Sequence, residues 1–344
     1  MRKILPIIST VLFLVLQSYS PAYSQNSGYK IVDRIKPGGE GGWDYLIAEP
    51  TMERLYVSRG THVQVIDLVK DTLVGDIPNT NGVHGIAIAV EFGKGYISDG
   101  RDSAVTVFDL KTLATLKKIK IDAVNPDAIV YDPFTKRVFT FNGRSSNATA
   151  IDASTDAIVG NMALDGKPEF AASDANGKMY VNLEDKSKIV EFDPKDLKVL
   201  NTWSLAPGDG PSGLAIDPEN HRLFSGCGNK KMVVLDAQSG KLIDTIAIGE
   251  GVDACGFDPG TQFAFSSNGE GTLTVVKEDS PDKFSVVENV PTQKSARTMA
   301  VDTKTHRVYL SCAEFGPPPE PTADHPHPRG QMIPGSFTIL VLAR

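Results

Sequence analysis

Residues 213–248 read GLAIDPENHRLFSGCGNKKMVVLDAQSGKLIDTIAI, which is four short apolar runs separated by turn residues. The first two runs are Gly213–Asp217 and Leu223–Gly226, with Asp-Pro-Glu-Asn between them, and the next two are Lys231–Asp236 and Lys241–Ile248. Runs of four to eight apolar and β-branched residues bounded by such turn signals are typical of β-strands. The segment therefore predicts four short consecutive strands, and nowhere does the chain show a convincing helical period.

The same pattern occurs seven times along the chain. An aromatic residue lies in the second run of each unit, and successive aromatics are 40 to 44 residues apart. These aromatic anchors are Tyr56, Tyr96, Phe139, Tyr180, Phe224, Phe265 and Tyr309. Four strands in a unit of about 40–45 residues correspond to one propeller blade. The sequence therefore predicts an all-β, seven-bladed β-propeller with four-stranded antiparallel blades.

The two ends of the chain support a closed ring. The seventh unit stops at its third strand, Phe337–Leu342, and a lone strand, Tyr29–Ile35, precedes the first unit. Because the lone strand resembles the fourth strand of the other units, we expect it to complete the last blade. Such a closure leaves no half-paired edge between the first and last blades. It defines one propeller domain over residues 29–344.

The first two dozen residues predict export from the cytoplasm. Arg2 and Lys3 precede the apolar stretch Ile4–Leu16, which is shorter than the roughly 20 residues of a membrane span. A small-residue site follows, and we interpret residues 1–24 as a signal peptide cleaved near Ser24-Gln25. The prediction is a periplasmic or secreted, monomeric protein with no membrane span after cleavage. A non-cleaved signal anchor is the alternative.

Charge argues against one class of partner. The chain has 35 basic and 42 acidic side chains and a formal net charge of −7. A dedicated nucleic-acid binder needs a basic face, so we expect no nucleic-acid partner.

The three cysteines are too few for a disulfide framework. Cys227 and Cys255 fall in adjacent units and are the pair that could form a bridge, whereas buried free thiols are the alternative.

Short segments of the second strands resemble a known family. Leu55-Tyr56-Val57-Ser58, Met179-Tyr180-Val181-Asn182 and Val308-Tyr309-Leu310-Ser311 resemble the Tyr-Val-Thr-Asn repeat of exported bacterial and archaeal propellers. Third-strand endings such as Val65-Ile66-Asp67 match it too. Over residues 29–344 the chain thus resembles the YncE-like, YVTN-repeat β-propeller family. The resemblance implies seven blades and a periplasmic or surface location but no activity. Motifs of the related quinoprotein-like, lactonase and haem d1 propellers are not visible.

Polar residues that differ between the units predict a binding surface. In a propeller the first strand of each blade is innermost, so residues at its start should ring one mouth of the central channel. The second strands end at the same mouth. Twelve residues before the anchors stand Asp44, His84, Asp127, Pro168, Ser212, Asp253 and Arg297. Three residues after the anchors stand Arg59, Asp99, Asn142, Leu183, Cys227, Asn268 and Cys312. We therefore expect one rim rich in acids, arginines and amides.

This rim could hold a ligand. Convergent polar groups in a concave site are what a ligand pocket needs, and crowded carboxylates attract a cation. Asp44, Asp127 and Asp253 could bind a divalent metal ion through oxygen. His84 would add an optional nitrogen ligand. Alternatively, the funnel stays hydrated and its acids pair with the two rim arginines.

A glycine-rich segment, Lys36–Trp43, leads into the first inner strand. Its glycines could admit a phosphate or a sugar close to the backbone, although no helix follows to complete a dinucleotide-binding motif. Trp43, beside Asp44, could be a stacking platform at the mouth or a packed residue at a blade interface.

A proline-rich insertion spans residues 315–335, between the second and third strands of the last blade. This connection leaves from the same mouth as the rim, and proline stiffens it into an extended arm. We hypothesise a lid or partner-docking arm, with His325 and His327 as possible ligands. A flexible surface loop with incidental histidines is the alternative.

Familiar catalytic motifs are missing from the sequence, including the Gly-x-Ser-x-Gly elbow, His-Glu-x-x-His and the phosphate-binding loop. The leading interpretation is a non-catalytic binding module that presents its acidic, histidine-bearing rim to a small ligand, a metal ion or a protein partner. A rim-centred enzyme is the alternative, either a metal-assisted hydrolase or lactonase or a cofactor-dependent redox propeller. A cell-envelope interaction scaffold is the third hypothesis. A divalent metal is the one cofactor that the residues suggest.

Overall fold

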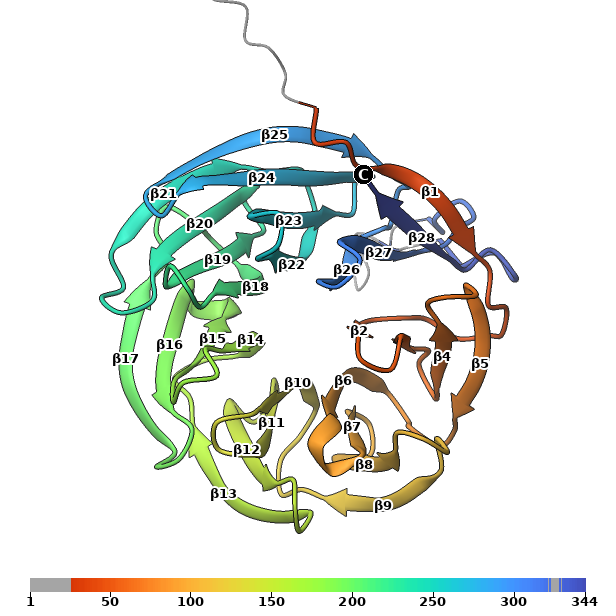
Figure 1. Ribbon diagram of the computed structural model, residues 1–344. Coiled ribbons are helices and arrows are strands. Elements are labelled where there is room, and N and C mark those ends of the chain that lie inside the picture. Colours follow the sequence, from red (N-terminus) through yellow and green to blue (C-terminus); the bar gives the residue numbers. More distant parts are fainter. Residues whose placement is uncertain (1–25, 321, 323–327, 329) are drawn as a thin grey trace, which may run out of the picture.

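The computed structural model describes residues 26–344 except 321, 323–327 and 329. Seven four-stranded antiparallel sheets stand as blades around a central axis (Figure 1). The molecule is a seven-bladed β-propeller, which confirms the predicted all-β fold. Residues 1–24, interpreted as a signal peptide, lie outside the described residues.

Each of the first six blades is one unit of the repeat, with its strands in sequence order from the axis outward. Blades 1 to 3 contain β2 (Leu46–Glu49), β3 (Arg54–Ser58), β4 (Val63–Asp67), β5 (Thr72–Ile77), β6 (Val83–Ala89), β7 (Lys94–Asp99), β8 (Ala104–Asp109), β9 (Thr115–Lys120), β10 (Pro126–Asp132), β11 (Arg137–Asn142), β12 (Asn147–Asp152) and β13 (Ala157–Ala163). Blades 4 to 6 contain β14 (Pro168–Ser173), β15 (Met179–Leu183), β16 (Lys188–Asp193), β17 (Lys198–Ser204), β18 (Pro211–Asp217), β19 (Arg222–Cys227), β20 (Lys231–Asp236), β21 (Leu242–Ala247), β22 (Val252–Asp258), β23 (Phe263–Asn268), β24 (Thr272–Ser280) and β25 (Lys283–Pro291).

The seventh blade is built from both ends of the chain. It contains β26 (Thr298–Asp302), β27 (Arg307–Cys312), β28 (Thr338–Ala343) and β1 (Lys30–Ile35). Strand β1 pairs antiparallel with β28, so that Lys30 lies opposite Ala343 and Ile35 opposite Ile339. The predicted closure by the N-terminal strand is confirmed.

The aromatic anchors form the centre of the core. All seven lie on the second strands and are at most 2% exposed. Some also join one blade to the next: the Tyr96 hydroxyl donates a hydrogen bond to the Ala153 carbonyl oxygen at 3.0 Å, and Tyr180 donates to Ala237 at 3.0 Å. The anchors therefore fill the blades and fix the neighbouring blades against each other.

Aspartates that end the third strands cap the turns that follow. Asp67 Oδ1 accepts hydrogen bonds from the backbone N–H groups of Val69 and Lys70, each at 2.9 Å. The same contacts occur at Asp109, Asp152, Asp193 and Asp236. Because a side-chain oxygen that accepts from its own turn stabilises that turn, these recurring acids are structural.

Helical structure in the described chain amounts to two short turns, η1 (Val90–Phe92) and η2 (Glu184–Lys186). Within that part of the chain, no helix has the length and apolar character needed to cross a membrane.

Truncation tests the ring closure. A chain that starts at Lys36 lacks β1, which leaves the edge of β28 unpaired and removes the buried side chains of Tyr29 and Ile35. We expect its thermal midpoint to fall by about 10 °C or more, since each lost kcal/mol lowers the midpoint of a domain this large by about 2–4 °C. Calorimetry on this chain and on a control that starts at Asn26 provides the measurement. Equal midpoints would show that the closure contributes little.

Candidate functional site

The starts of the inner strands meet at one mouth of the channel, where side chains contact those of adjacent blades. His84 of blade 2 lies between Asp44 of blade 1 and Asp127 of blade 3. Its Nδ1 is 2.7 Å from Asp44 Oδ2 and 3.4 Å from Asp127 Oδ1. We call these three residues the acidic cluster. The structure thus brings together three predicted rim residues that come from three separate repeats.

A second arc of rim residues comes from blades 5 to 7. The Arg297 guanidinium donates a hydrogen bond to Asp253 Oδ2, and Ser212 Oγ donates to Asp253 Oδ1 at 3.0 Å. Asp253 therefore forms an ion pair with the neighbouring blade and does not belong to the acidic cluster. The predicted metal set of four residues is reduced to three, because Arg297 already neutralises the fourth.

Side chains two residues after the anchors hold the backbone of the rim. Ser58 Oγ accepts a hydrogen bond from the backbone N–H of Asp44 at 2.9 Å. Ser98 Oγ, on blade 2, donates to the backbone carbonyl oxygen of Asp127, on blade 3, at 2.6 Å. The equivalent contacts in blades 4 and 6 run from Asn182 to Ser212 and from Ser267 to Arg297. Blades 2, 4 and 6 thus help to place the rim residue of the next blade, whereas Ser58 holds the rim residue of its own blade.

Burial shifts the titration of the acidic cluster towards neutral pH. Desolvation raises the pKa of Asp127 to about 6, and it raises the pKa of nearby Glu169 to about 7. Burial alone would lower the pKa of His84, but the hydrogen bond to Asp44 and the charge of Asp127 outweigh it, so that the net shift of the His84 pKa is upward. The cluster therefore exchanges protons in the pH range where most proteins work.

The acidic cluster has the donor set of a metal site. One imidazole nitrogen and two carboxylate oxygens lie within 4.8 Å of one another. Zinc binds nitrogen and oxygen ligands at about 2.0–2.2 Å, which separates neighbouring ligand atoms by about 3–3.6 Å. The two separations from His84 Nδ1 are 2.7 and 3.4 Å, so small side-chain movements would let all three residues reach one ion.

Two aromatic rings occupy the channel next to the acidic cluster. Tyr45 follows Asp44 in blade 1, and Phe170 comes from β14 of blade 4, across the ring in Figure 1. Their rings stack with centroids 4.4 Å apart and an interplanar angle of 27°. The Tyr45 hydroxyl is buried without a hydrogen-bond partner. Burial, together with the charges of Asp127 and Asp44, raises the pKa of Tyr45 well above its usual value.

Tyr45 was not among the residues predicted for the site, although the repeat contains a signal for it. Eleven residues before the anchors, five of the seven units have a small side chain. These five are Gly85, Ala128, Gly213, Ala254 and Thr298. The two exceptions are Tyr45 and Glu169, and both lie beside the acidic cluster. A large or charged side chain at a repeat position that is otherwise small would therefore have indicated these two residues.

Residues three positions after the anchors do not reach the mouth. Asp99 is fully buried, accepts a hydrogen bond from Thr106 Oγ1 at 2.6 Å and lies 3.2 Å from Lys118 Nζ. Asn142 and Asn268, also fully buried, donate hydrogen bonds to Thr149 and Thr274. These side chains lie on the faces of their blades and extend outward to the third and fourth strands. The structure therefore places all three side chains inside their blades, where polar partners of the same blade bind them, and not at the predicted rim, although Asp99 Oδ1 has no hydrogen-bond partner in the described part of the chain.

Arg59 is also fully buried, and it organises the glycine-rich segment. Its guanidinium donates hydrogen bonds to the carbonyl oxygens of Gly38 and Gly41, at 3.0 and 3.1 Å, and to Gln64 Oε1 at 2.7 Å. The guanidinium carbon also lies 3.7 Å from the centre of the Phe337 ring, and burial lowers the pKa of Arg59 to about 10. Arg59 therefore binds the carbonyl oxygens of the glycine-rich segment and does not face the rim acids.

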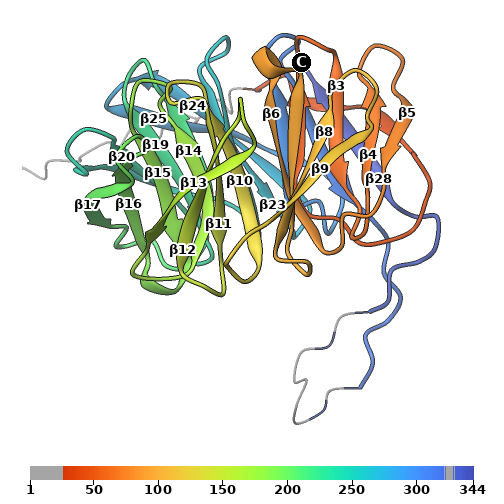
Figure 2. The same ribbon diagram turned by 90° about the horizontal axis from the view of Figure 1, so that it is seen from below.

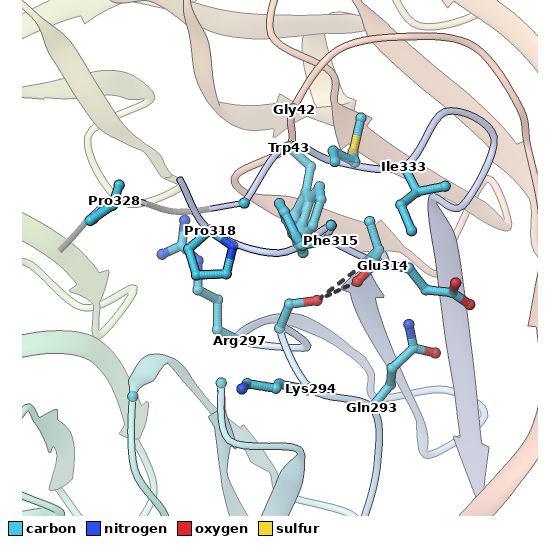
Figure 3. A pocket seen from close by; sticks show the side chains of 17 residues that line it. Gly42, Trp43, Gln293, Lys294, Arg297, Glu314, Phe315, Pro318, Pro328 and Ile333 are labelled. Atoms are coloured by element: carbon cyan, nitrogen blue, oxygen red, sulfur yellow. Dashed lines mark hydrogen bonds between the residues drawn. The ribbon is translucent and has the colours of Figure 1, made fainter. Parts of the chain in front are cut away.

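Trp43 packs at the base of the proline-rich insertion. Its ring centroid is 6.0 Å from that of Phe315 and 5.4 Å from that of Phe337. This is the packed alternative of the two predictions for Trp43. The residue also lines a pocket of about 1010 Å³, together with Arg297 and parts of the insertion (Figure 3).

The described parts of the insertion extend away from the body of the ring (Figure 2). Its base is a short backbone ladder, in which the N–H of Gly316 donates to Gln331 at 2.9 Å and the N–H of Ile333 donates to Glu314 at 2.8 Å. His325 and His327 lie outside the described residues, so their role as ligands stays a prediction.

The three cysteines are free and buried. The bridge considered between Cys227 and Cys255 is not formed, and the alternative of buried thiols is what the structure contains. Burial raises the pKa of Cys227 to about 11, which leaves this thiol unreactive at neutral pH.

Replacing Asp127 with Asn should stabilise the protein at neutral pH. The pKa of Asp127 is raised to about 6 in the folded chain, above the value of about 4 in an unfolded chain. Between about pH 4 and pH 6 the folded state therefore holds a proton that the unfolded chain has lost, and stability falls as the pH rises through this range. We expect Asp127→Asn to raise the free energy of unfolding by about 1–3 kcal/mol at pH 7 and by much less at pH 4.

Denaturant titration at both pH values measures this effect. Asp196→Asn, at an exposed turn of blade 4, is the matched control and should change little. A loss of stability at pH 7, or the same gain at both pH values, would contradict the burial argument.

Comparisons with known proteins agree with the fold. No protein-family model and no curated protein sequence matches the chain. Among solved structures, a chain in the crystal structure of the mitotic checkpoint complex is similar, with a TM-score of 0.74 and 11% sequence identity, and the match covers 98% of this chain and 99% of that chain. At this identity, the likeness shows a shared propeller fold.

Proposed function

We propose that this protein is a non-catalytic binding module that holds a divalent metal ion in the acidic cluster. The observation that carries the proposal is the meeting of one imidazole and two carboxylates from three blades. These side chains remain open to solvent, with exposed fractions of 25% for Asp44, 28% for His84 and 14% for Asp127. An ion thus has a path from solvent to three ligands that a closed ring holds in place.

The nitrogen ligand favours a particular group of metals. Calcium and magnesium take oxygen ligands, whereas imidazole suits zinc and neighbouring transition metals. Three protein ligands also leave a coordination position for water or for a group of a bound molecule. We therefore expect Zn²⁺ to bind more tightly than Mg²⁺ or Ca²⁺.

We place this binding module in the periplasm or outside the cell, on the basis of the export signal and the resemblance to YVTN-repeat propellers. An envelope protein is a second class of partner in this proposal. The similar chain belongs to a structure named as a complex, which supports a general use of such propellers as binding or scaffold modules.

A metal-assisted hydrolase or lactonase is the second candidate, and Glu169 favours it. Burial raises the pKa of Glu169 to about 7, and the charge of Asp127 also raises it. Such a pKa suits a group that takes and returns a proton at neutral pH. Hydrolysis of a lactone probe by zinc-loaded protein, lost in Glu169→Gln with the metal retained, would decide for the enzyme.

Zinc titration of metal-free protein tests the proposed function. Isothermal titration calorimetry should detect one ion per chain. His84→Gln and Asp127→Asn should each weaken binding by at least about tenfold, because each removes one of three ligands. Asp196→Asn is the control and should bind as the parent does. Absence of binding, or binding that both cluster variants retain, would overturn the proposal.

The affinity for the ion should rise with pH. Metal ligands must be deprotonated, and the pKa of Asp127 is raised to about 6 while that of His84 is raised above its usual value. Protons therefore compete with the ion at low pH, and we expect affinity to fall by at least about tenfold from pH 7.5 to pH 5. The same titration in three buffers measures the slope. A flat profile would mean that the ion binds elsewhere.

A further inference from the structure

A second site lies at the same mouth, away from the acidic cluster. The pocket of about 1010 Å³ is bordered by blade 7, the end of blade 6, the glycine-rich segment and the base of the insertion. None of the acidic-cluster residues lines it. Small-molecule sites in proteins have volumes of about 300–1,000 Å³. The pocket is therefore large enough for a small organic ligand.

One side of the pocket is apolar and aromatic. Trp43 and Phe315 lie there with ring centroids 6.0 Å apart, and Met332 and Ile333 continue the wall. The backbone bridge between Phe315 and Met332 fixes the two segments of the insertion base against each other. Phe315 and Ile333 are 43% and 42% exposed. Because removing such apolar surface from water is favourable, this wall suits the apolar body of a ligand.

Two cationic side chains lie on another side of the pocket. Lys294 and Arg297 both line it, and Figure 3 shows them apart from the carboxylate of Glu314. Among the described residues, no carboxylate forms an ion pair with the exposed Lys294, whereas Arg297 pairs with Asp253. An anionic group that entered here would therefore meet one unpaired ammonium and one guanidinium already bound by a single carboxylate.

We propose that this pocket binds a small amphipathic carboxylate. Its apolar body would lie against Trp43 and Phe315, and its carboxylate would accept hydrogen bonds from Lys294 and Arg297. Charge-assisted hydrogen bonds to the ligand give orientation, and coverage of the aromatic wall gives affinity. The site is separate from the proposed metal site, so either proposal can fail without the other.

Decanoate is a suitable probe, with decylamine of the same chain length as its cationic counterpart. Trp43 and Trp203 are the two tryptophans of the chain, so Trp203→Phe leaves Trp43 as the reporter in the pocket. We expect decanoate to change the Trp43 emission and to bind in calorimetry at least about tenfold more tightly than decylamine. Equal binding of the two probes, or tighter binding of decylamine, would overturn the proposal.

Variants locate the binding determinants. Lys294→Glu and Phe315→Ala should each weaken decanoate binding by about tenfold, while Lys294→Arg and Phe315→Leu should preserve most of it. Lys283→Glu, at the exposed start of β25, is the charge-matched control and should have no effect. Decanoate binding that survives both Lys294→Glu and Phe315→Ala would show that the ligand binds outside this pocket.

Asp253→Asn gives a test in the opposite direction. Asp253 competes with the ligand carboxylate for the Arg297 guanidinium, so its loss should tighten decanoate binding by about threefold or more. Asp196→Asn, at an exposed turn of blade 4, should leave decanoate binding unchanged. Weaker decanoate binding in Asp253→Asn would contradict the role of Arg297.

Discussion

The pairing of β1 with β28 is the constraint on which the rest of the structure depends. It joins the two ends of the described chain in one sheet, so that seven inner strands surround a single axis. In a closed ring, two neighbours fix the position of every blade. The ring can therefore hold polar side chains close together at the starts of the inner strands, despite their mutual repulsion and the cost of removing them from water.

The two polar arcs of the mouth use this rigidity differently. In blades 5 to 7, Arg297 neutralises Asp253, as in an ordinary structural ion pair. In blades 1 to 3, Asp127 is only 14% exposed beside His84, and desolvation raises its pKa. Such an arrangement costs stability at neutral pH. Desolvation raises the pKa of Asp253 as well, so the two arcs differ in their partners: an arginine pairs with Asp253, whereas a histidine and a second carboxylate surround Asp127.

Arg297 links the two proposed sites physically. It bonds Asp253 beside the channel and also lines the pocket under the insertion. Burial raises the pKa of Asp253, the Arg297 guanidinium opposes this shift, and the charge of Asp44 adds to it, so the two carboxylates interact across the mouth. A ligand carboxylate that drew Arg297 away from Asp253 would leave more negative charge near the acidic cluster and favour a bound cation. Coupling of this kind is reciprocal.

The sequence by itself determined the fold and the positions at the mouth. Strand runs, turn residues and aromatic anchors recur at a fixed interval, and equivalent residues of consecutive units become neighbours in a ring, as Asp44, His84 and Asp127 do. Only the tertiary structure decided where other side chains point. The repeat pattern predicts Asp99 at the same mouth, but its side chain extends outward and accepts a hydrogen bond from Thr106. Tyr45 stacks on Phe170 across the channel, a contact set by the width of the closed ring, which no local pattern contains.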